Sequence, residues 1–400
     1  MQMSDLTGFS QDHISKAEWL VKEAHKNDGL APLDVQKFWA DQDEAIKTPF
    51  AKSIKQVPLG VFHSNEVVFD ELGIPEDMWK LETDEQWKLS VNKAFNDKAE
   101  KIVGRRLLNE KPRPPEEDRY PGVKMLHDVF EAKNIWHQGS WWLQQSANTE
   151  DELKALLDRV ESRDIRKFIL PEGWEEAKKR LLPRGIKPGL YRWQRGPCTF
   201  ATSIYGSENM IFLVLDNPDL AKRLSNAILK TMLEIARVLD EEAGYTTESA
   251  PHGFGFADDN CCLFNPEMYE LFGYPILKGV FDRYSPNPGD NRYQHSDSSM
   301  AHLLPFFTKL NMTGVNFGPT LTVKEIREHC PKAVIHGQLA PFTFSRNEEV
   351  RLVCEFLRDF EQAKEKRGLL VATAGSINNG SRLTGMRLLM AAAQLWGRYE

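Results

Sequence analysis

The 400-residue chain lacks long apolar runs and clustered positive charge. It contains no stretch of about 18 apolar residues, the length typical of a membrane-spanning helix. Its amino terminus, MQMSDLTGFSQDH, has no basic segment followed by an apolar one, as an export signal would have. The formal net charge of −7, without a basic cluster, disfavours nucleic acid and anionic membranes as partners. These absences predict a cytoplasmic protein.

Paired cysteines and the common catalytic motifs are also missing. The five cysteines are scattered and form no CxxC, which argues against a disulfide framework and against a zinc knuckle. The chain has no Walker loop, GxGxxG, HExxH or GxSxG motif. Nucleotide-binding, zinc-protease and serine-hydrolase functions are therefore disfavoured.

The composition is that of a globular protein, with 41% hydrophobic and 27% charged residues. The length fits two ordinary domains or one (β/α)8 barrel with extra elements. The sequence changes character near Pro183. Before it lie polar, helix-like stretches with many tryptophans, interrupted by the proline- and charge-rich segment 109–122. We expect this inserted segment to be an exposed loop, because proline removes a backbone donor and disrupts helices.

After Pro183, short β-branched or aromatic runs alternate with amphipathic stretches, which is typical of repeated β-α units and a parallel sheet. Two further strands, one around 56–62 and one within 125–170, would bring the total to eight. The predicted fold is α/β, a (β/α)8 TIM barrel over 56–400 with additional N-terminal helices over 1–55. The six strands predicted after Pro183 cover 189–196, 252–259, 291–298, 314–318, 333–339 and 369–375.

Several helices carry start signals. Asn217 and Asn265 are each followed by proline, a pattern that predicts an N-cap with proline at the first helical position. Thr322 and Ser345 are each followed three residues later by glutamate, which predicts capping boxes.

In a barrel of this kind the active site lies at the carboxyl ends of the strands. His295 and Asp297 stand two residues apart at such an end, so their side chains point to the same side if the strand continues. A histidine, or a carboxyl group made more neutral by burial, can act as a general acid. The structural alternative is that Asp297 caps the next helix and His295 merely ends the strand.

The other candidates are chosen in the same way, because they also lie at the carboxyl ends of predicted strands. Of Asp258 and Asp259 only one can point inwards, so one is expected to be functional and the other to support the loop. A surface ion pair or a structural role remains an alternative for the arginines and for His336. The further strand-end candidates, mostly for substrate binding, are His63, Arg192, Arg195, Asn260, Asn316, His336, Gln338, Ser376, Asn378 and Asn379.

The order of these segments resembles the uroporphyrinogen decarboxylase superfamily, over roughly 185–400 and more faintly from about 56. The resemblance rests on RGPCTFATSIYG (195–206), on HGQLAP (336–341) and on the long segments 256–282, 295–317 and 373–397. It implies a single (β/α)8 barrel. It also implies one of two chemistries: decarboxylation of a tetrapyrrole, or methyl transfer to the cobalt of a corrinoid protein.

Departures from the family pattern bear on that choice. The family's decarboxylases carry an early arginine-rich segment that grips the substrate's carboxylates, whereas 57–73 contains no arginine. The thiol-activating methyltransferases bind zinc through His-x-Cys and a later Gly-Cys. This chain has His295-x-Asp297 and Gly375-Ser376 instead, so the soft thiolate ligands are absent. Zinc on oxygen and nitrogen ligands stays open, and the metal is unknown.

The resemblance is therefore closest to the demethylating branch of anaerobic, corrinoid-dependent systems. It implies that the chain takes a methyl group from a methoxylated aromatic or a methylamine-like donor, the methoxylated aromatic being favoured, with His295 or Asp297 supplying a proton. In that scheme Asp259 or His336 holds the substrate.

The chain has no Asp-x-His-x-x-Gly, so a corrinoid would arrive on a separate carrier protein. Trp136, Trp141 and Trp142 could line the substrate pocket, contact that partner or belong to the core. The alternatives are a lyase acting on another carboxylated substrate and a non-catalytic ligand-binding barrel.

Overall fold

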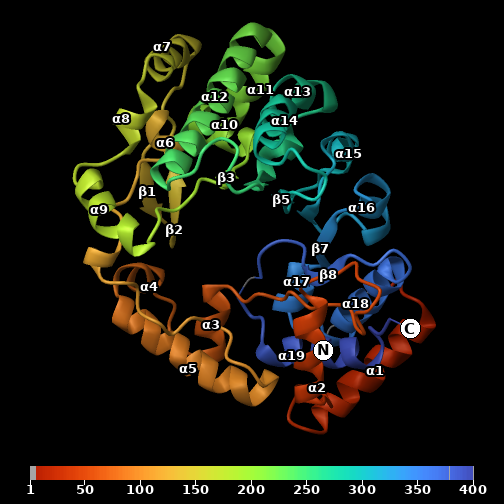
Figure 1. The fold of residues 1–400 in the computed structure, drawn as a ribbon. Helices are drawn as coiled ribbons and strands as arrows, with labels where there is room; N and C mark the ends of the chain where they lie inside the picture. The colour runs from red at the N-terminus through yellow and green to blue at the C-terminus, as the bar shows by residue number, and fades with distance from the viewer. Residues whose placement is uncertain (1–5, 378, 400) are drawn as a thin grey trace. The chain divides into compact units, whose positions relative to one another are not determined.

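A computed structural model describes residues 6–377 and 379–399 (Figure 1). The chain divides into two compact units, one formed by Met1–Pro112 with Gly314–Glu400 and the other by Arg113–Thr313. Both units are built from parallel strands that alternate with helices. Within the described residues, no helix is long and apolar enough to cross a membrane.

The unit Arg113–Thr313 contains three parallel strands in the order β3-β4-β5 and a separate antiparallel hairpin, β1-β2. Its strands are β1 (Asn134–His137), β2 (Ser140–Leu143), β3 (Trp193–Arg195), β4 (Phe254–Ala257) and β5 (Arg292–Ser296). Its α-helices are α6 (Leu126–Val129), α7 (Glu150–Glu161), α8 (Ile165–Ile169), α9 (Trp174–Leu181), α10 (Pro197–Tyr205), α11 (Ser207–Asp216), α12 (Pro218–Glu242), α13 (Pro266–Leu271), α14 (Gly273–Tyr284) and α15 (Leu304–Leu310). Its 3-10 turns are η1 (Glu116–Asp118), η2 (Leu182–Arg184), η3 (Asp259–Leu263) and η4 (Ala301–Leu303).

The two faces of β3-β4-β5 differ in character because side chains alternate along a strand. On one face Phe254 and Phe256 are buried, and the ring of Phe256 lies 5.6 Å from that of Phe281 on α14. On the other face Trp193, Gly255 and Tyr293 stand in register across the three strands. The hydrophobic core of the unit therefore lies between the strands and the helices, and the opposite face carries more accessible side chains.

Gly255 allows two aromatic side chains to meet over the middle strand. A Cβ atom at this position would lie 2.5 Å from the Trp193 ring, closer than real contacts allow. The rings of Trp193 and Tyr293, from the flanking strands, lie 5.5 Å apart. Any larger residue at 255 would have to displace the indole, so this glycine shapes the accessible face of the sheet.

The unit formed by Met1–Pro112 and Gly314–Glu400 contains parallel strands in the order β6-β7-β8. The first helix, α1, packs against α18 and α19. The strands are β6 (Gly314–Phe317), β7 (Val334–Leu339) and β8 (Leu369–Thr373). The helices are α1 (Gln11–His25), α2 (Val35–Ala45), α3 (Asn65–Leu72), α4 (Met78–Thr83), α5 (Glu85–Val103), α16 (Val323–His329), α17 (Pro341–Ser345), α18 (Glu349–Ala363) and α19 (Leu383–Leu395).

All six strands predicted after Pro183 are present. The segment expected as an earlier strand, 56–62, lies beside β8, where Leu59 pairs with Val371 in the parallel sense and the Gly60 N–H donates to the Val371 carbonyl over 2.7 Å. It forms an isolated bridge and not a full strand. The strand expected within 125–170 is wrong as a member of the parallel sheet, because this region forms the β1-β2 hairpin.

The helix starts mostly agree with their predicted caps. The side chains of Asn217 and Asn265 accept hydrogen bonds from the backbone of α12 and α13, and Thr322 forms a complete capping box at α16. The box predicted at Ser345 is wrong. Ser345 is the last residue of α17, and α18 begins only at Glu349, after a turn through Asn347 with a positive φ of 53°.

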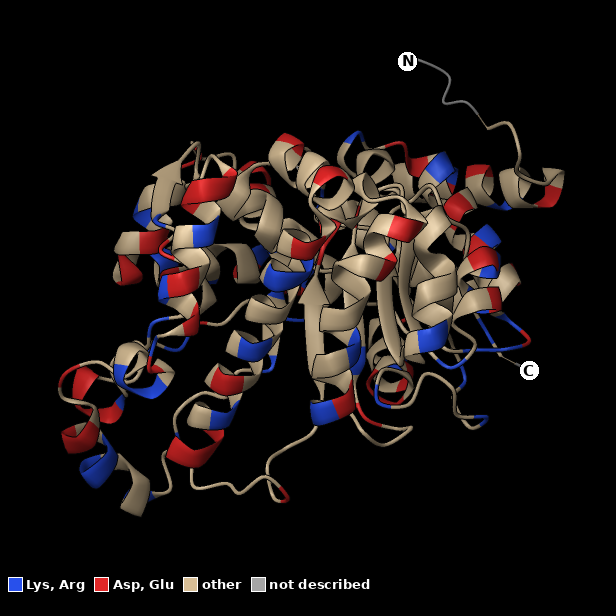
Figure 2. Cartoon of the chain, turned by 90° about the horizontal axis from the view of Figure 1, so that it is seen from above, with Lys and Arg blue, Asp and Glu red and all other residues tan. Residues whose placement is uncertain are grey.

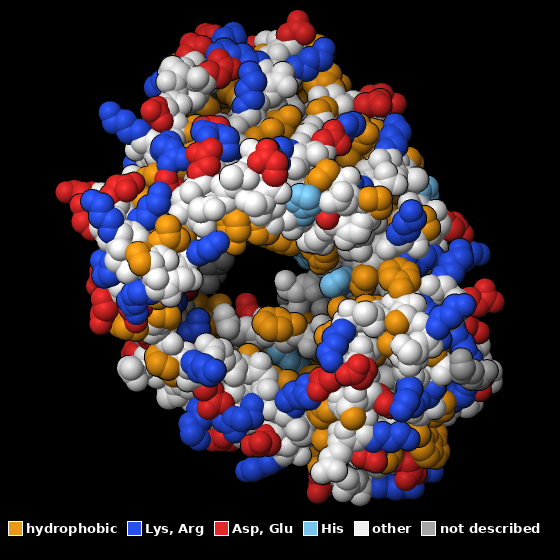
Figure 3. Space-filling model, in the orientation of Figure 1, with side chains coloured by type: hydrophobic (Ala, Val, Ile, Leu, Met, Phe, Trp, Pro, Cys, Tyr) orange, Lys and Arg blue, Asp and Glu red, His pale blue; other side chains and the backbone are white. Residues whose placement is uncertain are grey.

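Charged residues of both signs are interspersed along the helices, as Figure 2 shows. On the face shown in Figure 3, hydrophobic side chains also lie among the charged ones. Segment 109–122 contains a single 3-10 turn, Glu116–Asp118, and most of its residues are exposed.

Candidate functional site

The candidate site lies at the carboxyl ends of β3, β4 and β5. Arg195, Ala257 and His295 are aligned across the three strands. Two residues later, just past the ends of β4 and β5, stand Asp259, the first residue of η3, and Asp297. Because all three strands are parallel, their last residues and the loops that follow meet at one edge.

Asp259, His295 and Asp297 form a compact cluster. The Oδ1 atom of Asp259 accepts a hydrogen bond from the backbone N–H of Asp297 over 3.1 Å and lies 3.7 Å from Nε2 of His295. The hydroxyl of Ser298 donates to the backbone carbonyl of Asp259 over 2.6 Å. Ligand atoms of the three clustered side chains all lie within 4.8 Å of one another. The two loops are thus joined, and two carboxyl groups and an imidazole share one location.

The proton affinity of Asp297 is altered by this setting. Partial desolvation raises the pKa of the Asp297 carboxyl, the neighbouring Asp259 carboxylate raises it further, and His295 opposes the shift. The protonated form of Asp297 is therefore favoured at higher pH than in an isolated carboxyl group. Such a group is suited to giving a proton to a departing oxygen.

A cavity of about 480 Å³ adjoins the cluster through Asp259. Trp142, from the β1-β2 hairpin, and Trp193, from β3, line it, and each is 52% exposed. Exposed indoles provide flat apolar walls of the kind that contact aromatic ligands. The lining residues are Trp142, Leu143, Trp193, Arg195, Thr199, Ser203, Ala257, Asp259 and Asn260.

Arg195 supplies a positive charge to this cavity. Its guanidinium donates to the hydroxyl of Ser203 over 3.1 Å, and within the described residues no carboxylate lies within 4.0 Å of it. Burial lowers the pKa of Arg195, and the charge of Asp259 opposes that shift. The arginine nevertheless stays cationic at neutral pH and can attract an anionic or developing negative charge.

Asp258 points away from the cluster, as alternation along the chain requires. Its buried carboxylate accepts hydrogen bonds from the backbone N–H groups of Thr199 over 2.7 Å and Cys198 over 3.3 Å, at the start of α10. Burial raises the pKa of Asp258 to about 6. The side-chain amide of Asn260 donates to the hydroxyl of Thr202 over 2.7 Å. Both residues therefore tie the loop after β4 to α10.

The remaining predicted residues belong to the other unit. His63 is buried, with its ring 6.2 Å from Phe95 and 5.8 Å from Phe344, and neither ring nitrogen has a hydrogen-bond partner among the described residues. Burial lowers the pKa of His63 to about 4. Gln338 is buried, and its amide donates to the carbonyls of Gly318 and Leu321.

Three other predicted positions, Asn316, His336 and Ser376, lie on β6, on β7 and after β8. His336 on β7 is half-buried, and burial lowers its pKa. Asn316 donates its amide to the carbonyls of His336 and Thr373. Ser376 is exposed, and Asn378 lies outside the described residues.

Trp193 and Ser203 lie at the site but were not among the candidates from sequence. Trp193 precedes Arg195 by two positions and so shares its face, a signal that the strand pattern contained. Ser203, which holds Arg195, lies on the following helix, and nothing in the sequence distinguished it. The candidate Arg192 does not line this cavity, and its guanidinium donates to the carboxylate of Asp240 over 2.6 Å.

A comparison with protein families finds that residues 193–396 match uroporphyrinogen decarboxylase (URO-D). The chain belongs to the URO-D family. Among the solved structures that match its fold is a methyltransferase from Methanosarcina mazei, at 14% sequence identity and a TM-score of 0.52, covering 85% of this chain and 94% of that one. No curated protein sequence matches the chain.

The predicted fold class, an α/β fold of the (β/α)8 type, is the class to which the family match and the structural match assign this chain. The prediction is therefore confirmed. The family match spans β3 to α19 and so includes the carboxyl ends of β3, β4 and β5 that carry the cluster.

Proposed function

We propose that this URO-D family protein removes the methyl group of a methoxylated aromatic compound and transfers it to the cobalt of a separate corrinoid protein. The observation that carries the proposal is the cluster of Asp259, His295 and Asp297 beside a cavity with indole walls. It combines groups that can activate an ether oxygen with surfaces suited to an aromatic ring.

The reaction requires the carbon–oxygen bond of the ether to break with its electron pair remaining on oxygen. The methyl carbon forms its new bond with the electron pair of cobalt(I), a strong nucleophile that needs no activation by this chain. The chain's task is to make the oxygen a better leaving group. In this proposal Asp297, whose pKa is raised, gives that oxygen a proton, and His295 and Asp259 adjoin it.

The same three side chains also fit a divalent metal ion, since one nitrogen and two oxygen ligands converge within 4.8 Å. Zn²⁺ accepts such ligands, and when bound it would supply Lewis-acid polarisation of the oxygen. His295, Asp259 and Asp297 would hold it. Arg195, on the same face of the sheet, would stabilise negative charge that develops on the departing oxygen.

The test is to mix the purified protein with a reduced corrinoid carrier protein and a methoxylated phenol, and to follow the absorption band of methyl-cobalt. We expect the band to form only when all three components are present. Formation of the demethylated phenol in equal amount, measured by chromatography, would establish the balance. If no methyl group moves from a panel of aryl methyl ethers, the proposal is wrong.

A lyase function is the competing outcome, because Arg195 could anchor a carboxylate as well as a developing phenolate. Release of carbon dioxide from aromatic or aliphatic acids would favour it. The two activities are separated by the product measured, so one set of incubations distinguishes them.

A further inference from the structure

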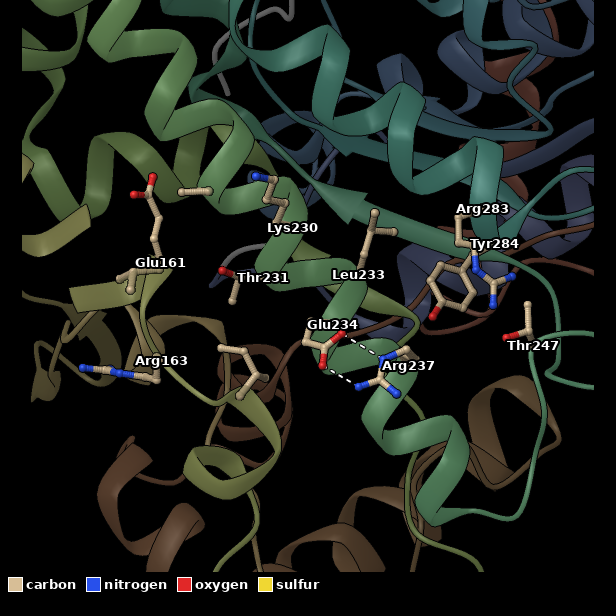
Figure 4. A pocket seen from close by; sticks show the side chains of 13 residues that line it. Glu161, Arg163, Lys230, Thr231, Leu233, Glu234, Arg237, Thr247, Arg283 and Tyr284 are labelled. Carbon is tan, nitrogen blue, oxygen red and sulfur yellow. Dashed lines mark hydrogen bonds and ion pairs between the residues drawn. The ribbon is translucent and has the colours of Figure 1, made fainter. Parts of the chain in front are cut away.

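A second, larger cavity lies on the outer side of the helices in the unit Arg113–Thr313. It measures about 510 Å³, which is within the range of roughly 300–1,000 Å³ that small-molecule sites occupy. Its walls come from α7, α8, α12, the end of α14 and the loop before β4 (Figure 4). It shares no residue with the cavity beside Asp259.

The floor of this outer cavity is apolar. Val160 and Ile165 contribute from one side, Ala227 and Leu233 from α12, and the ring of Tyr284 from the other side. The α12 residues that line it run from Ala227 to Arg237, ten positions, or roughly 15 Å along the helix axis. The cavity is therefore long enough for an extended organic molecule and not only for an ion.

Four cationic side chains border the cavity, but two of them are already engaged. Arg237 is paired with Glu234, as Figure 4 shows, at 2.5 Å, and Arg163 is paired with Glu131 at 2.8 Å. Lining carboxylates are engaged too, since Glu161 is held by Arg223 at 2.7 Å. The existing ion pairs therefore neutralise most of the rim.

Lys230 and Arg283 are the exceptions. Within the described residues no carboxylate lies within 4.0 Å of either side chain. The Arg283 guanidinium instead lies 4.9 Å from the centre of the Tyr284 ring. The cavity thus combines an apolar floor with two cations whose charge is not balanced by a local ion pair, which complements a ligand that has an apolar body and an anionic group.

We propose that this outer cavity binds an organic carboxylate with an acyl or aryl body. Arg283, at one end of the cavity, attracts the carboxylate, and the apolar floor covers the body toward Lys230 at the other end (Figure 4). The site is separate from the cluster at Asp259. Its occupation does not depend on the proposed methyl transfer.

The proposal is tested by isothermal titration of the intact protein with octanoate and with 3-phenylpropanoate, using 1-octanol as the uncharged comparison. We expect one carboxylate to bind per chain, and octanol to bind at least about tenfold more weakly, because it lacks the charge-assisted hydrogen bonds. Whichever of octanoate and 3-phenylpropanoate binds more tightly shows whether the cavity prefers an alkyl or an aryl body.

Matched variants locate the binding. Arg283→Gln should weaken carboxylate binding by about tenfold, and Lys230→Gln, at the other end of the cavity, should weaken it less. Lys222→Gln, an exposed lysine on the same helix outside the cavity, should leave it unchanged, as should Arg195→Gln at the other cavity. Absence of saturable binding, equal affinity for octanol, or loss of binding in Arg195→Gln with retention in Lys230→Gln and Arg283→Gln would overturn the proposal.

Discussion

The imidazole Nε2 of His295 lies 3.7 Å from Oδ1 of Asp259, although the two residues are 36 positions apart in the chain. The parallel pairing of β4 with β5 creates this proximity, because it aligns Ala257 with His295 and leaves Asp259 just beyond. The same Asp259 oxygen accepts the backbone N–H of Asp297. One carboxylate therefore organises both loops, and the predictions below test the members of the cluster separately.

Asp297→Asn should reduce methyl transfer by about a hundredfold or more, the usual cost of removing a general acid. The amide is nearly the same size but has no proton to give. Because the pKa of Asp297 is raised, the wild-type rate should fall as pH rises through that raised value, and the variant's residual rate should lack this dependence. The measurement is the rate of methyl-cobalt formation across pH.

Ser299→Ala, an exposed position two residues further on, serves as the control and should keep the wild-type rate. Circular dichroism should be the same for both variants. A wild-type rate in Asp297→Asn would remove this residue from the mechanism.

Metal binding is tested by replacing ligands one at a time. If the cluster activates the oxygen through a metal ion and not through a proton from Asp297, the protein should bind one Zn²⁺ per chain, and Asp259→Asn, His295→Gln and Asp297→Asn should each weaken the affinity by about tenfold or more. Titration against a competing chelator provides the measurement, and it does not require activity. Asp258→Asn is the informative comparison, because this carboxylate faces α10 and should not contribute. Equal affinity in all four variants would place the metal elsewhere.

The indole walls should determine how well aromatic substrates bind. Trp142→Ala and Trp193→Ala should each raise KM for a methoxylated phenol by about three- to tenfold, the effect of losing one aromatic contact, with a smaller change in kcat. Phe212→Ala, which removes an equally exposed ring on α11, should leave KM unchanged. If KM stays constant in both tryptophan variants, the substrate does not lie against these rings.

Gly255→Ala offers an independent approach to the same wall. The added methyl group would lie 2.5 Å from the Trp193 ring and must displace it. We expect a loss of about 1–3 kcal/mol in the free energy of unfolding, as for other overpacked positions, together with a changed tryptophan fluorescence. The double variant Gly255→Ala, Trp193→Ala should recover stability. If it does not, the strain lies in the backbone and not in the contact with the indole.

The positions of the six strands could be read from the sequence because each is a short β-branched or aromatic run between turn residues. The β1-β2 hairpin was missed because its tryptophans appeared to belong to a helix. Its turn signal was the pair Gln138-Gly139, where both residues adopt positive φ as a two-residue hairpin turn requires. Recognising it would also have shown why Trp142 is exposed.

The cluster was partly accessible to the same reasoning. Alternation along a strand explains why Asp259 and not Asp258 faces His295, although the sequence alone could not say which of the two did so. The burial of His63 was not accessible, since a histidine after an apolar run appears equally suited to a ligand pocket or to a core. Only the packing of Phe95 and Phe344 around it distinguishes these cases.

His63 makes the stability of the protein depend on pH. Its folded-state pKa of about 4 lies below the value of about 6.5 expected in the unfolded chain. The unfolded state therefore binds the proton first as the pH falls, so the stability present above pH 6.5 is progressively lost between about pH 6.5 and pH 4. For this residue alone the loss between pH 7 and pH 4.5 is about 2 kcal/mol.

His63→Leu should reduce that loss, because leucine fills a similar volume and does not titrate. The measurement is urea unfolding of both proteins at pH 7 and pH 4.5. Other groups contribute equally to both proteins, so the difference between the two pH-dependent losses isolates His63. The same loss in the variant as in the wild type would mean that the imidazole is protonated within the folded protein. In that case the His63 imidazole must have a polar partner, and its contacts with Phe95 and Phe344 would not account for its environment.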